Sequence, residues 1–388
     1  MKPFRITWTD DEIDALKQAL AAATVPPAPA GAGWALGCDR DFLLRMRDHW
    51  LTGYDWRAAM ADLNRYPQFI TEIDGLAVHF IHVKGEGPSP RPMLLTHGWP
   101  GSVYEFWAVI DRLAYPSRHG GRAEDAFDLV VPSLPGYGYS GKPEQPIGPR
   151  TTAGLWEKLM TERLGYSSYL AQGGDWGSLV TAKLALHHPE NLRGVHLNMA
   201  ASLRSDRPMQ NPEEESWAQR SALAFQMLSG YSMVQMMKPM SLAYLGAGNP
   251  LGQAAWILER FHDWSDLTQG DLESVYGLDH LITNIMLYVM TGSFESALWF
   301  YNGLIREGQL DLAEGQQCTV PLGIAAFPND ALLPVPPRSR VELVASNLMH
   351  WTDMPAGGHF AAMEQPDLFA QDVLAWADKV WPGCGGRA

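Results

Sequence analysis

The stretch Gly173-Gly174-Asp175-Trp176-Gly177 decides the fold of this 388-residue chain. A short apolar run, 169–171, precedes it, and a helix-like run, 179–187, follows it. A strand, a sharp turn and a helix in this order present the central side chain, here Asp175, at the end of a sheet. The flanking glycines leave room for the strained backbone of such a turn. This pattern predicts a carboxylate nucleophile that forms an ester with a saturated carbon, whereas the simpler interpretation is a turn whose Asp175 caps the next helix.

Strand-like and helix-like runs alternate around this turn, which indicates βαβ units in a mainly parallel sheet. The predicted strands cover 76–83, 93–96, 127–131, 168–171, 192–197, 322–327 and 341–344. Helices are predicted over 10–23, 41–51, 55–63 and 367–380. Between about 202 and 317 the periodicity is helical without strand signals, and methionines cluster there at 227, 233, 236, 237 and 240. We therefore expect an α/β-hydrolase fold, with a mostly parallel central sheet flanked by helices and an inserted helical lid.

The composition excludes several classes of protein. The chain is 46% hydrophobic and has a net charge of -14 without a Lys/Arg-rich run, so neither nucleic acid nor an anionic membrane is expected as a partner. Cys38, Cys318 and Cys384 are odd in number and far apart, which fits neither a disulfide framework nor a zinc site. We find no signal peptide and no apolar stretch long enough to cross a bilayer. A cytoplasmic protein without metal or organic cofactor is expected.

A nucleophile needs a base and an acid that orients the base. His359 lies in Gly357-Gly358-His359-Phe360, before the final predicted helix, and satisfies the chain order nucleophile, acid, histidine. Asp330, directly after a predicted strand, is the candidate acid, with Glu342 and Asp353 as rivals. The simpler interpretations are a loop histidine without a partner and, for Asp330, a turn or cap residue.

A second turn, His97-Gly98-Trp99-Pro100-Gly101-Ser102, also follows a predicted strand. Backbone N–H groups in such a loop, joined by the N–H after the nucleophile, hold a developing oxyanion. We assign these donors to Trp99 and Trp176, whose side chains can equally be core aromatics because this role uses only the backbone. The motif residues that support the two turns are His97, Gly98, Pro100, Gly173, Gly174 and Gly177.

Taken together, these motifs resemble those of the epoxide hydrolases of the microsomal type, including their soluble microbial relatives. The matching stretches span nearly the whole chain and lie at 54–57, 63–64, 73–76, 79–82, 97–102, 132–140, 172–178 and 357–360. The resemblance implies that an apolar epoxide and water become a vicinal diol, without a cofactor, through an ester on Asp175 that His359-activated water hydrolyses. It implies Asp330 as the orienting acid, as in many soluble members. Membrane-bound members carry an N-terminal anchor helix, for which we find no counterpart here, so no membrane anchor is expected.

The resemblance also implies two lid tyrosines that donate hydrogen bonds to the epoxide oxygen. Gly230-Tyr231 matches the first and Phe300-Tyr301 the second, with Tyr244 as a nearby rival of Tyr231. From the sequence alone, core packing is the favoured interpretation of both side chains, because aromatic residues in apolar helices usually pack, and the family match reverses that judgement. The Met-rich lid favours an apolar substrate, because methionine adapts to irregular shapes.

The domain boundaries follow the family arrangement. Residues 1–90 are expected to form an N-terminal meander that packs on core and lid, and residues 202–318 the lid. The hydrolase core is expected in two parts, 91–201 and 319–388. The resemblance also makes a homodimer an option.

Three other functions compete with this interpretation. A haloalkane or haloacid dehalogenase shares the Asp nucleophile, and Trp176 could donate to its halide, but it needs neither paired lid tyrosines nor the meander. A Ser-type esterase is disfavoured because Asp175 occupies the nucleophile position. A catalytically silent binding protein would be expected to have lost one of the triad or tyrosine residues.

Overall fold

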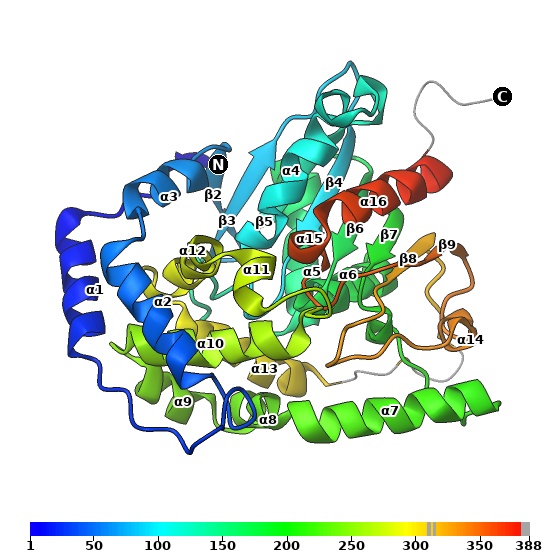
Figure 1. Cartoon of the computed structure of the whole chain (residues 1–388). Helices are drawn as coiled ribbons and strands as arrows, with labels where there is room; N and C mark the ends of the chain where they lie inside the picture. Colours follow the sequence, from blue (N-terminus) through cyan, green and yellow to red (C-terminus); the bar gives the residue numbers. More distant parts are fainter. Residues whose placement is uncertain (309–311, 313–315, 382–388) are drawn as a thin grey trace.

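A nine-stranded sheet forms the centre of the molecule (Figure 1). The computed structural model describes residues 1–308, 312 and 316–381. The strand order is β1-β2-β3-β5-β4-β6-β7-β8-β9; pairs from β5 to β9 are parallel, and β1, β2 and β3 pair antiparallel. The strands are β1 Lys2–Phe4, β2 Gln68–Ile73, β3 Leu76–Val83, β4 Arg91–Thr96, β5 Phe127–Pro132, β6 Tyr169–Gly173, β7 Leu192–Leu197, β8 Leu322–Ala326 and β9 Leu348–Asp353. The predicted α/β-hydrolase fold is confirmed.

The parallel part of the sheet positions the site. Every residue of β5, β6 and β8 is buried, as expected for strands covered on both faces. Helix α4 (Trp107–Ala114) packs beside α16 (Pro366–Val380), and α5 (Pro149–Lys158) beside α6 (Asp175–His187). Because parallel strands end at one edge, the loops after β4, β6, β8 and β9 meet there. Short helical turns η1 to η5 and α15 complete the core at Val103–Phe106, Pro116–His119, Ala123–Asp125, Leu159–Arg163, Ala200–Ser202 and Ala361–Glu364.

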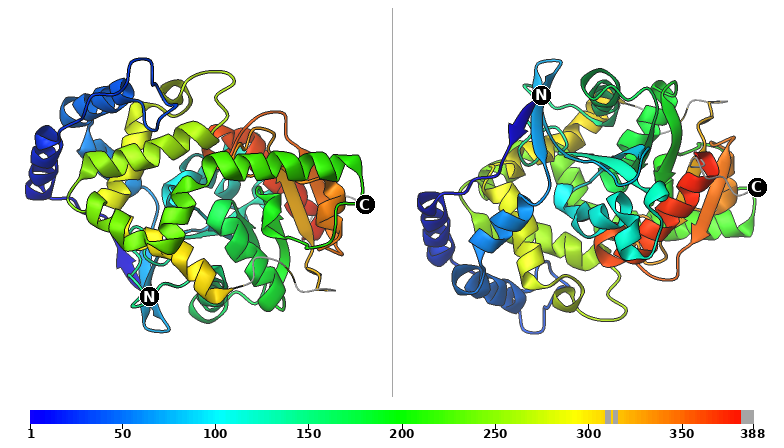
Figure 2. Two further views of the ribbon diagram at one scale, coloured as in Figure 1. Left: turned by 90° about the horizontal axis from the view of Figure 1, so that it is seen from below. Right: turned by 90° about the horizontal axis from the view of Figure 1, so that it is seen from above.

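The lid is inserted between β7 and β8, and its described residues contain helices without a named strand (Figure 2). Its helices are α7 Pro212–Leu228, α8 Gly230–Met237, α9 Pro239–Gly246, α10 Pro250–Trp264, α11 Leu272–Tyr276, α12 Leu278–Val289 and α13 Phe294–Glu307. Helix α13 packs against both α8 and α9. Helix α7 extends along the lower edge of the molecule in Figure 1, with Glu214 as its buried residue.

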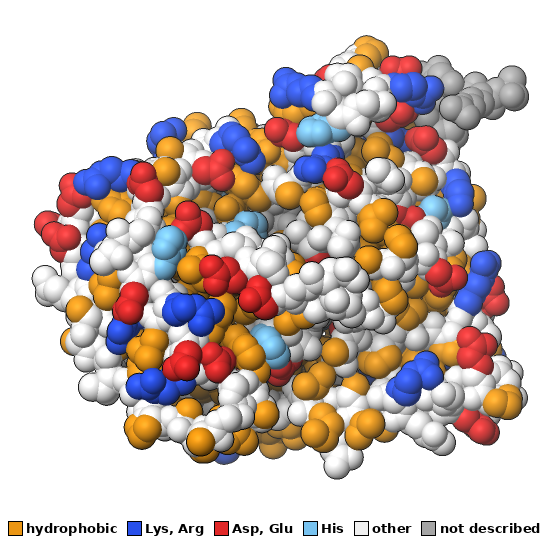
Figure 3. All heavy atoms as spheres, in the orientation of Figure 1, with side chains coloured by type: hydrophobic (Ala, Val, Ile, Leu, Met, Phe, Trp, Pro, Cys, Tyr) orange, Lys and Arg blue, Asp and Glu red, His pale blue; other side chains and the backbone are white. Residues whose placement is uncertain are grey.

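Most of the clustered lid methionines face outward. Met227, Met233, Met237 and Met240 are exposed, and hydrophobic side chains gather along the lower edge in Figure 3. From this cluster, Met236 lines an internal cavity that Asp175 also lines. Neighbouring positions on a helix point to different sides, so a run of methionines cannot all face one pocket.

The N-terminal segment contains both helices and part of the sheet. Helices α1 (Asp10–Ala22), α2 (Arg40–Thr52) and α3 (Trp56–Leu63) agree with the predicted ones, and α1 and α2 pack on lid helix α10. Thr9 is the N-cap of α1 and forms a capping box with Glu12. The Thr9 hydroxyl accepts from the Glu12 N–H, and the Glu12 carboxylate accepts from the Thr9 N–H. Strands β1 and β2 were not predicted from the sequence. Because β3 pairs with β5, residues 68–83 belong to the core sheet although they precede residue 90.

The predicted strand at 341–344 is wrong. Helix α14 (Arg338–Glu342) occupies this region, and the last strand is β9. Val341 and Val344 are buried three residues apart while Glu342 is exposed, which is the spacing of one helical turn. A run of four residues is too short to separate this period from the strand period.

Two further observations concern the whole described chain. Cys38 and Cys318 are free thiols, and Cys384 lies outside the described residues. None of the helices at 1–308, 312 and 316–381 combines the length and apolarity that crossing a bilayer requires.

Candidate active site

Asp175 lies at the strained turn between β6 and α6. Its φ of 47° is left-handed, which costs a residue with a Cβ roughly 1–2 kcal/mol. The turn is pressed against its surroundings: a Cβ at Gly173 would lie 2.1 Å from Gly177 O, and one at Gly177 1.8 Å from Thr96 O. Glycine is therefore required at both positions, and the strain at Asp175 is held by close packing.

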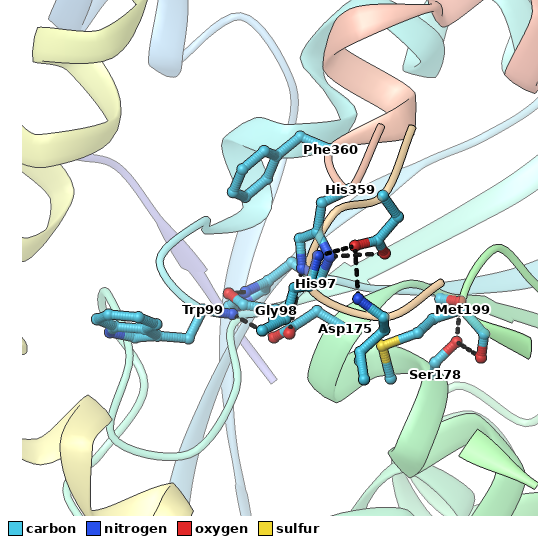
Figure 4. A network of polar contacts seen from close by, with 12 residues as sticks. His97, Gly98, Trp99, Asp175, Ser178, Met199, His359 and Phe360 are labelled. Atoms are coloured by element: carbon cyan, nitrogen blue, oxygen red, sulfur yellow. Dashed lines mark hydrogen bonds and ion pairs between the residues drawn. The ribbon is translucent and has the colours of Figure 1, made fainter. Parts of the chain in front are cut away.

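Three loops bring the predicted residues together around the Asp175 carboxylate (Figure 4). The Trp99 N–H donates to Asp175 Oδ1 at 2.8 Å. His359 Nε2 lies 3.3 Å from Asp175 Oδ2, and its Nδ1–H donates to Asp330 Oδ2 at 3.0 Å. Asp330 follows β8 and His359 follows β9, so the acid, base and carboxylate come from three strand ends of one sheet edge. The rivals Glu342 and Asp353 bind elsewhere, to Arg338 and Trp351.

The charges around His359 set its protonation. The imidazole is 2% exposed, and this burial favours the neutral form. The carboxylates of Asp330 and Asp175 outweigh burial and hold the pKa of His359 well above its usual value. His359 is therefore an imidazolium while both carboxylates are ionised.

Hydrogen bonds from His97 and from the lid hold the turn at 97–102 in place. His97 is buried, its Nδ1–H donates to Gly98 O at 2.9 Å, and its Nε2 accepts from the Leu134 N–H at 3.1 Å. Burial lowers the pKa of His97 to about 4, so this ring is neutral and structural. The Trp99–Pro100 peptide is cis, and Pro100 O accepts from Asn284 Nδ2 in α12. Gly98 has no room for a side chain, since a Cβ there would lie 2.3 Å from Asp175 Oδ1.

Trp176 follows Asp175 in the first turn of α6. The first four N–H groups of a helix have no partner inside it, so the Trp176 N–H is available at the elbow. Its indole ring meets the Tyr301 ring edge-on, with 4.5 Å between centroids. The backbone and side chain of Trp176 thus contribute to different parts of the site.

Tyr231 in α8 and Tyr301 in α13 lie on the lid side of the same site. The Tyr231 ring stacks on Trp99 at 5.3 Å and meets the Tyr301 ring edge-on at 5.8 Å. Burial, together with the Asp175 charge, raises the pKa of both phenols well above 10.0. Both therefore keep their protons as hydrogen-bond donors. The rival Tyr244 is 74% exposed and lies outside this cluster.

One cavity of about 140 Å³ contains the carboxylate and both phenols. Asp175 and Trp176 form its core side, and Tyr231 and Tyr301 its lid side. The rest of its wall is mostly apolar, with Leu179, Met199, Ser202, Arg204, Phe225, Ser229, Ser232, Met236, Leu304, Leu332 and Leu333. A small apolar group would be held between the elbow and the lid.

Two acidic residues that sequence analysis missed hold the catalytic loops. Asp266, after α10, accepts from the Gly357 N–H and from Asn329 Nδ2, both at 2.9 Å. Burial opposes ionisation, yet the hydrogen bonds that Asp266 accepts lower its pKa to about 2. Glu364 accepts from the N–H groups of Gly358 and Phe360, both at 2.8 Å. No local motif marks either residue, because their partners lie in other loops.

Glu105 is a third acidic residue that sequence analysis missed. It lies in η1, and its Oε1 accepts from the Gly98 N–H at 3.2 Å. Burial and the nearby Asp175 charge raise the pKa of Glu105 to about 8, so it carries a proton at neutral pH. Glu105 therefore supports the Gly98 turn without adding a second full charge beside Asp175.

The fold and the carboxylate at its elbow define the class: an α/β-hydrolase with aspartate in place of serine. Residues 1–106 match the family described as epoxide hydrolase N terminus, and residues 91–284 match the α/β-hydrolase fold family. Epoxide hydrolase 1 of Oryctolagus cuniculus is 34% identical over 98% of this chain and 89% of its own. The chain belongs to the epoxide hydrolase family, as its motifs indicated.

Solved structures agree with this assignment. The Aspergillus niger epoxide hydrolase superposes with a TM-score of 0.84 and 31% identity, covering 98% of this chain and 96% of that one. The juvenile hormone epoxide hydrolase from Bombyx mori superposes with a TM-score of 0.87 and 28% identity, covering 98% and 94%. These matches extend over core, lid and N-terminal segment alike.

Proposed function

We propose that this enzyme hydrolyses apolar epoxides to vicinal diols through an ester on Asp175. One observation carries the proposal: a carboxylate, held at a strained turn, shares an apolar cavity with two protonated phenols. An epoxide needs a nucleophile on carbon and acid help on oxygen, and these groups supply both from opposite walls.

In the first step, Asp175 attacks a ring carbon from the side opposite the C–O bond that breaks. Oδ2 is the attacking oxygen, because Oδ1 stays bound to the Trp99 N–H and becomes the ester carbonyl oxygen. Tyr231 and Tyr301 donate to the departing oxygen and stabilise the alkoxide until it gains a proton. Orientation of this kind can lower the barrier by up to about 7–11 kcal/mol.

Ester formation changes the charge around His359. The Asp175 carboxylate becomes neutral, so one of the two anions that raise the His359 pKa disappears. The imidazolium then releases a proton, which balances the proton that the alkoxide gains. His359 is thereby converted to the neutral base that the second step requires.

In the second step, His359 takes a proton from water, and the resulting hydroxide attacks Asp175 Cγ. The oxyanion is held by the N–H groups of Trp99 and Trp176. Collapse breaks the Cγ–O bond to the substrate, releases the diol and returns a carboxylate beside an imidazolium. Asp330 orients the imidazole through its 3.0 Å hydrogen bond throughout.

A single turnover with excess enzyme in oxygen-18 water tests the proposal. The label should enter the Asp175 side chain, as read by peptide mass spectrometry, because water attacks the enzyme ester and not the epoxide. An Asp175→Ala variant should form no ester, and His359→Gln should accumulate it. His187→Gln, which changes an exposed histidine of α6, is the matched control and should complete the cycle. Labelled diol beside unlabelled Asp175 would establish direct attack by water and refute the ester.

Dehalogenation is the second candidate, and one observation favours it. The indole N–H groups of Trp99 and Trp176 are buried and make no hydrogen bond within the described part of the chain. A leaving halide requires donors of this kind beside an Asp nucleophile, whereas the paired phenols favour an oxygen leaving group. Halide release from 1-bromohexane, compared with diol formation from 1,2-epoxyhexane under the same conditions, separates the two functions.

A further inference from the structure

A second cavity lies beside the one that contains Asp175. It has a volume of about 320 Å³, more than twice that of the inner cavity. Helix α7 forms one wall through Trp217, Ser221, Ala222 and Phe225, and the segment 333–341 forms another. We call this space the α7 chamber. Arg204, Phe225 and Leu333 line both cavities, so the α7 chamber adjoins the cavity of Asp175 at these side chains.

Most polar side chains of the α7 chamber have partners within the protein, whereas the buried Ser221 hydroxyl has none among the described residues. Trp217 Nε1 donates to Pro334 O at 2.9 Å. Arg340 donates to Ser205 O at 2.8 Å and to Arg207 O at 3.0 Å, and its guanidinium lies 3.7 Å from Glu214. The remaining wall is largely hydrocarbon, which suits an apolar ligand that makes few hydrogen bonds.

Most side chains of helix α7 are not buried against the rest of the protein. Glu214, near its N-terminus, is its buried residue and anchors that end through Ser339 at 2.7 Å. Phe225 is 53% exposed although it borders both cavities. The side of α7 that carries Trp217, Ala222 and Phe225 faces the α7 chamber, and an apolar occupant would remove the exposed surface of Phe225 from water.

The inner cavity is too small for a long substrate. Its volume of about 140 Å³ is close to that of an engineered cavity of about 150 Å³ that binds benzene. An epoxide ring and a few carbons fill such a space. A longer chain attached to the ring must leave it, and the α7 chamber adjoins it at Phe225 and Leu333.

We propose that the α7 chamber binds the distal part of the substrate, so that the favoured substrates are epoxides with a long unbranched hydrocarbon chain. This inference rests on the proposed function, because the chain is placed by an epoxide ring held between Asp175 and the lid phenols. The inner cavity binds the epoxide ring, and the α7 chamber binds the hydrocarbon chain.

A chain-length series tests this assignment. For the wild-type enzyme, kcat/KM should rise at least about tenfold from 1,2-epoxyhexane to 1,2-epoxydodecane, since each methylene removed from water favours binding by about fourfold. Ala222→Trp fills the α7 chamber without touching the inner cavity, and should abolish that rise while hydrolysis of epoxyhexane changes less than about twofold. Gln219→Trp, an exposed position of the same helix that lines neither cavity, is the matched control and should behave as wild type.

The outcomes separate the two proposals. If Ala222→Trp loses activity on both substrates, Ser221→Phe fills the same space with a smaller change and decides the question. Equal chain-length dependence in the wild type and in a chamber-filled variant overturns the α7 chamber assignment and leaves the hydrolase intact. If the wild-type enzyme forms diol from neither epoxide, the proposed function itself is overturned.

Discussion

Replacing Gly98 by alanine should disable the nucleophile without unfolding the protein. A Cβ at this position would lie 2.3 Å from both Oδ1 and Cβ of Asp175, whereas ordinary van der Waals contact begins at 3.4 Å. The loop and the elbow must therefore separate by about 1 Å. Neither yields easily, because Gly98 is held by Glu105 and the elbow is pressed against Thr96.

The expected loss follows from this displacement. A misplacement of about 1 Å at reacting groups lowers the rate on the order of 100-fold, which corresponds to about 2.7 kcal/mol of barrier. The hydrogen bond from the Trp99 N–H to Asp175 Oδ1, now 2.8 Å, would lengthen by the same movement. Overpacking of a buried site costs about 1–3 kcal/mol of folding stability, less than the usual total of about 5–15 kcal/mol.

The assay is the rate of ester formation in a single turnover, quenched in acid and read by intact-protein mass, with a thermal melt as the folding control. Gly154→Ala in α5 is the matched variant, because its new Cβ would meet only His188 Nε2 at 3.7 Å. It should form the ester at the wild-type rate. If folded Gly98→Ala also formed ester within about threefold of wild type, contact between the turn and the carboxylate would not control the reaction.

Three other predictions address the lid, the loops and the core. Tyr301→Phe keeps the ring contact with Trp176 at 4.5 Å but removes the hydroxyl, so ester formation should slow by about 10²–10³-fold at an unchanged melting temperature. Asp266→Ala frees the loops of Asn329 and Gly357, so hydrolysis of the ester should slow by about tenfold, more than its formation, and ester should accumulate during steady-state turnover. Burial opposes ionisation of Asp372, yet hydrogen bonds from His196 and His350 hold its pKa well below 3.8. The unfolded chain therefore takes up this proton first as the pH falls, and the stability that Asp372 contributes above about pH 5 should be lost progressively below it. Urea unfolding of Asp372→Asn should show about 3 kcal/mol less stability at pH 7 and a weaker dependence on pH between 5 and 3.

Two elements of the fold, strand β1 and helix α14, were not predicted from local sequence patterns. Strand β1 (Lys2–Phe4) is three residues long and exists through its pairing with β2, so no local pattern predicts it. The apolar spacing at 341–344 fits a strand or a helical turn, and Pro337 at the N-cap of α14 is the local sign of a helix that was missed.

The sequence by itself determined the order of the strands and helices around Asp175, the strained turn and the candidate base and acid. Each of these rests on a short motif, whose steric and hydrogen-bonding limits act locally, and on the order of the motifs along the chain. Only the tertiary structure decided that Asp266, Glu364 and Glu105 hold the loops, that Tyr231 faces the elbow and Tyr244 does not, and that a second cavity adjoins the first. Each of these is a contact between segments far apart in the chain, and such contacts are set by how the segments pack.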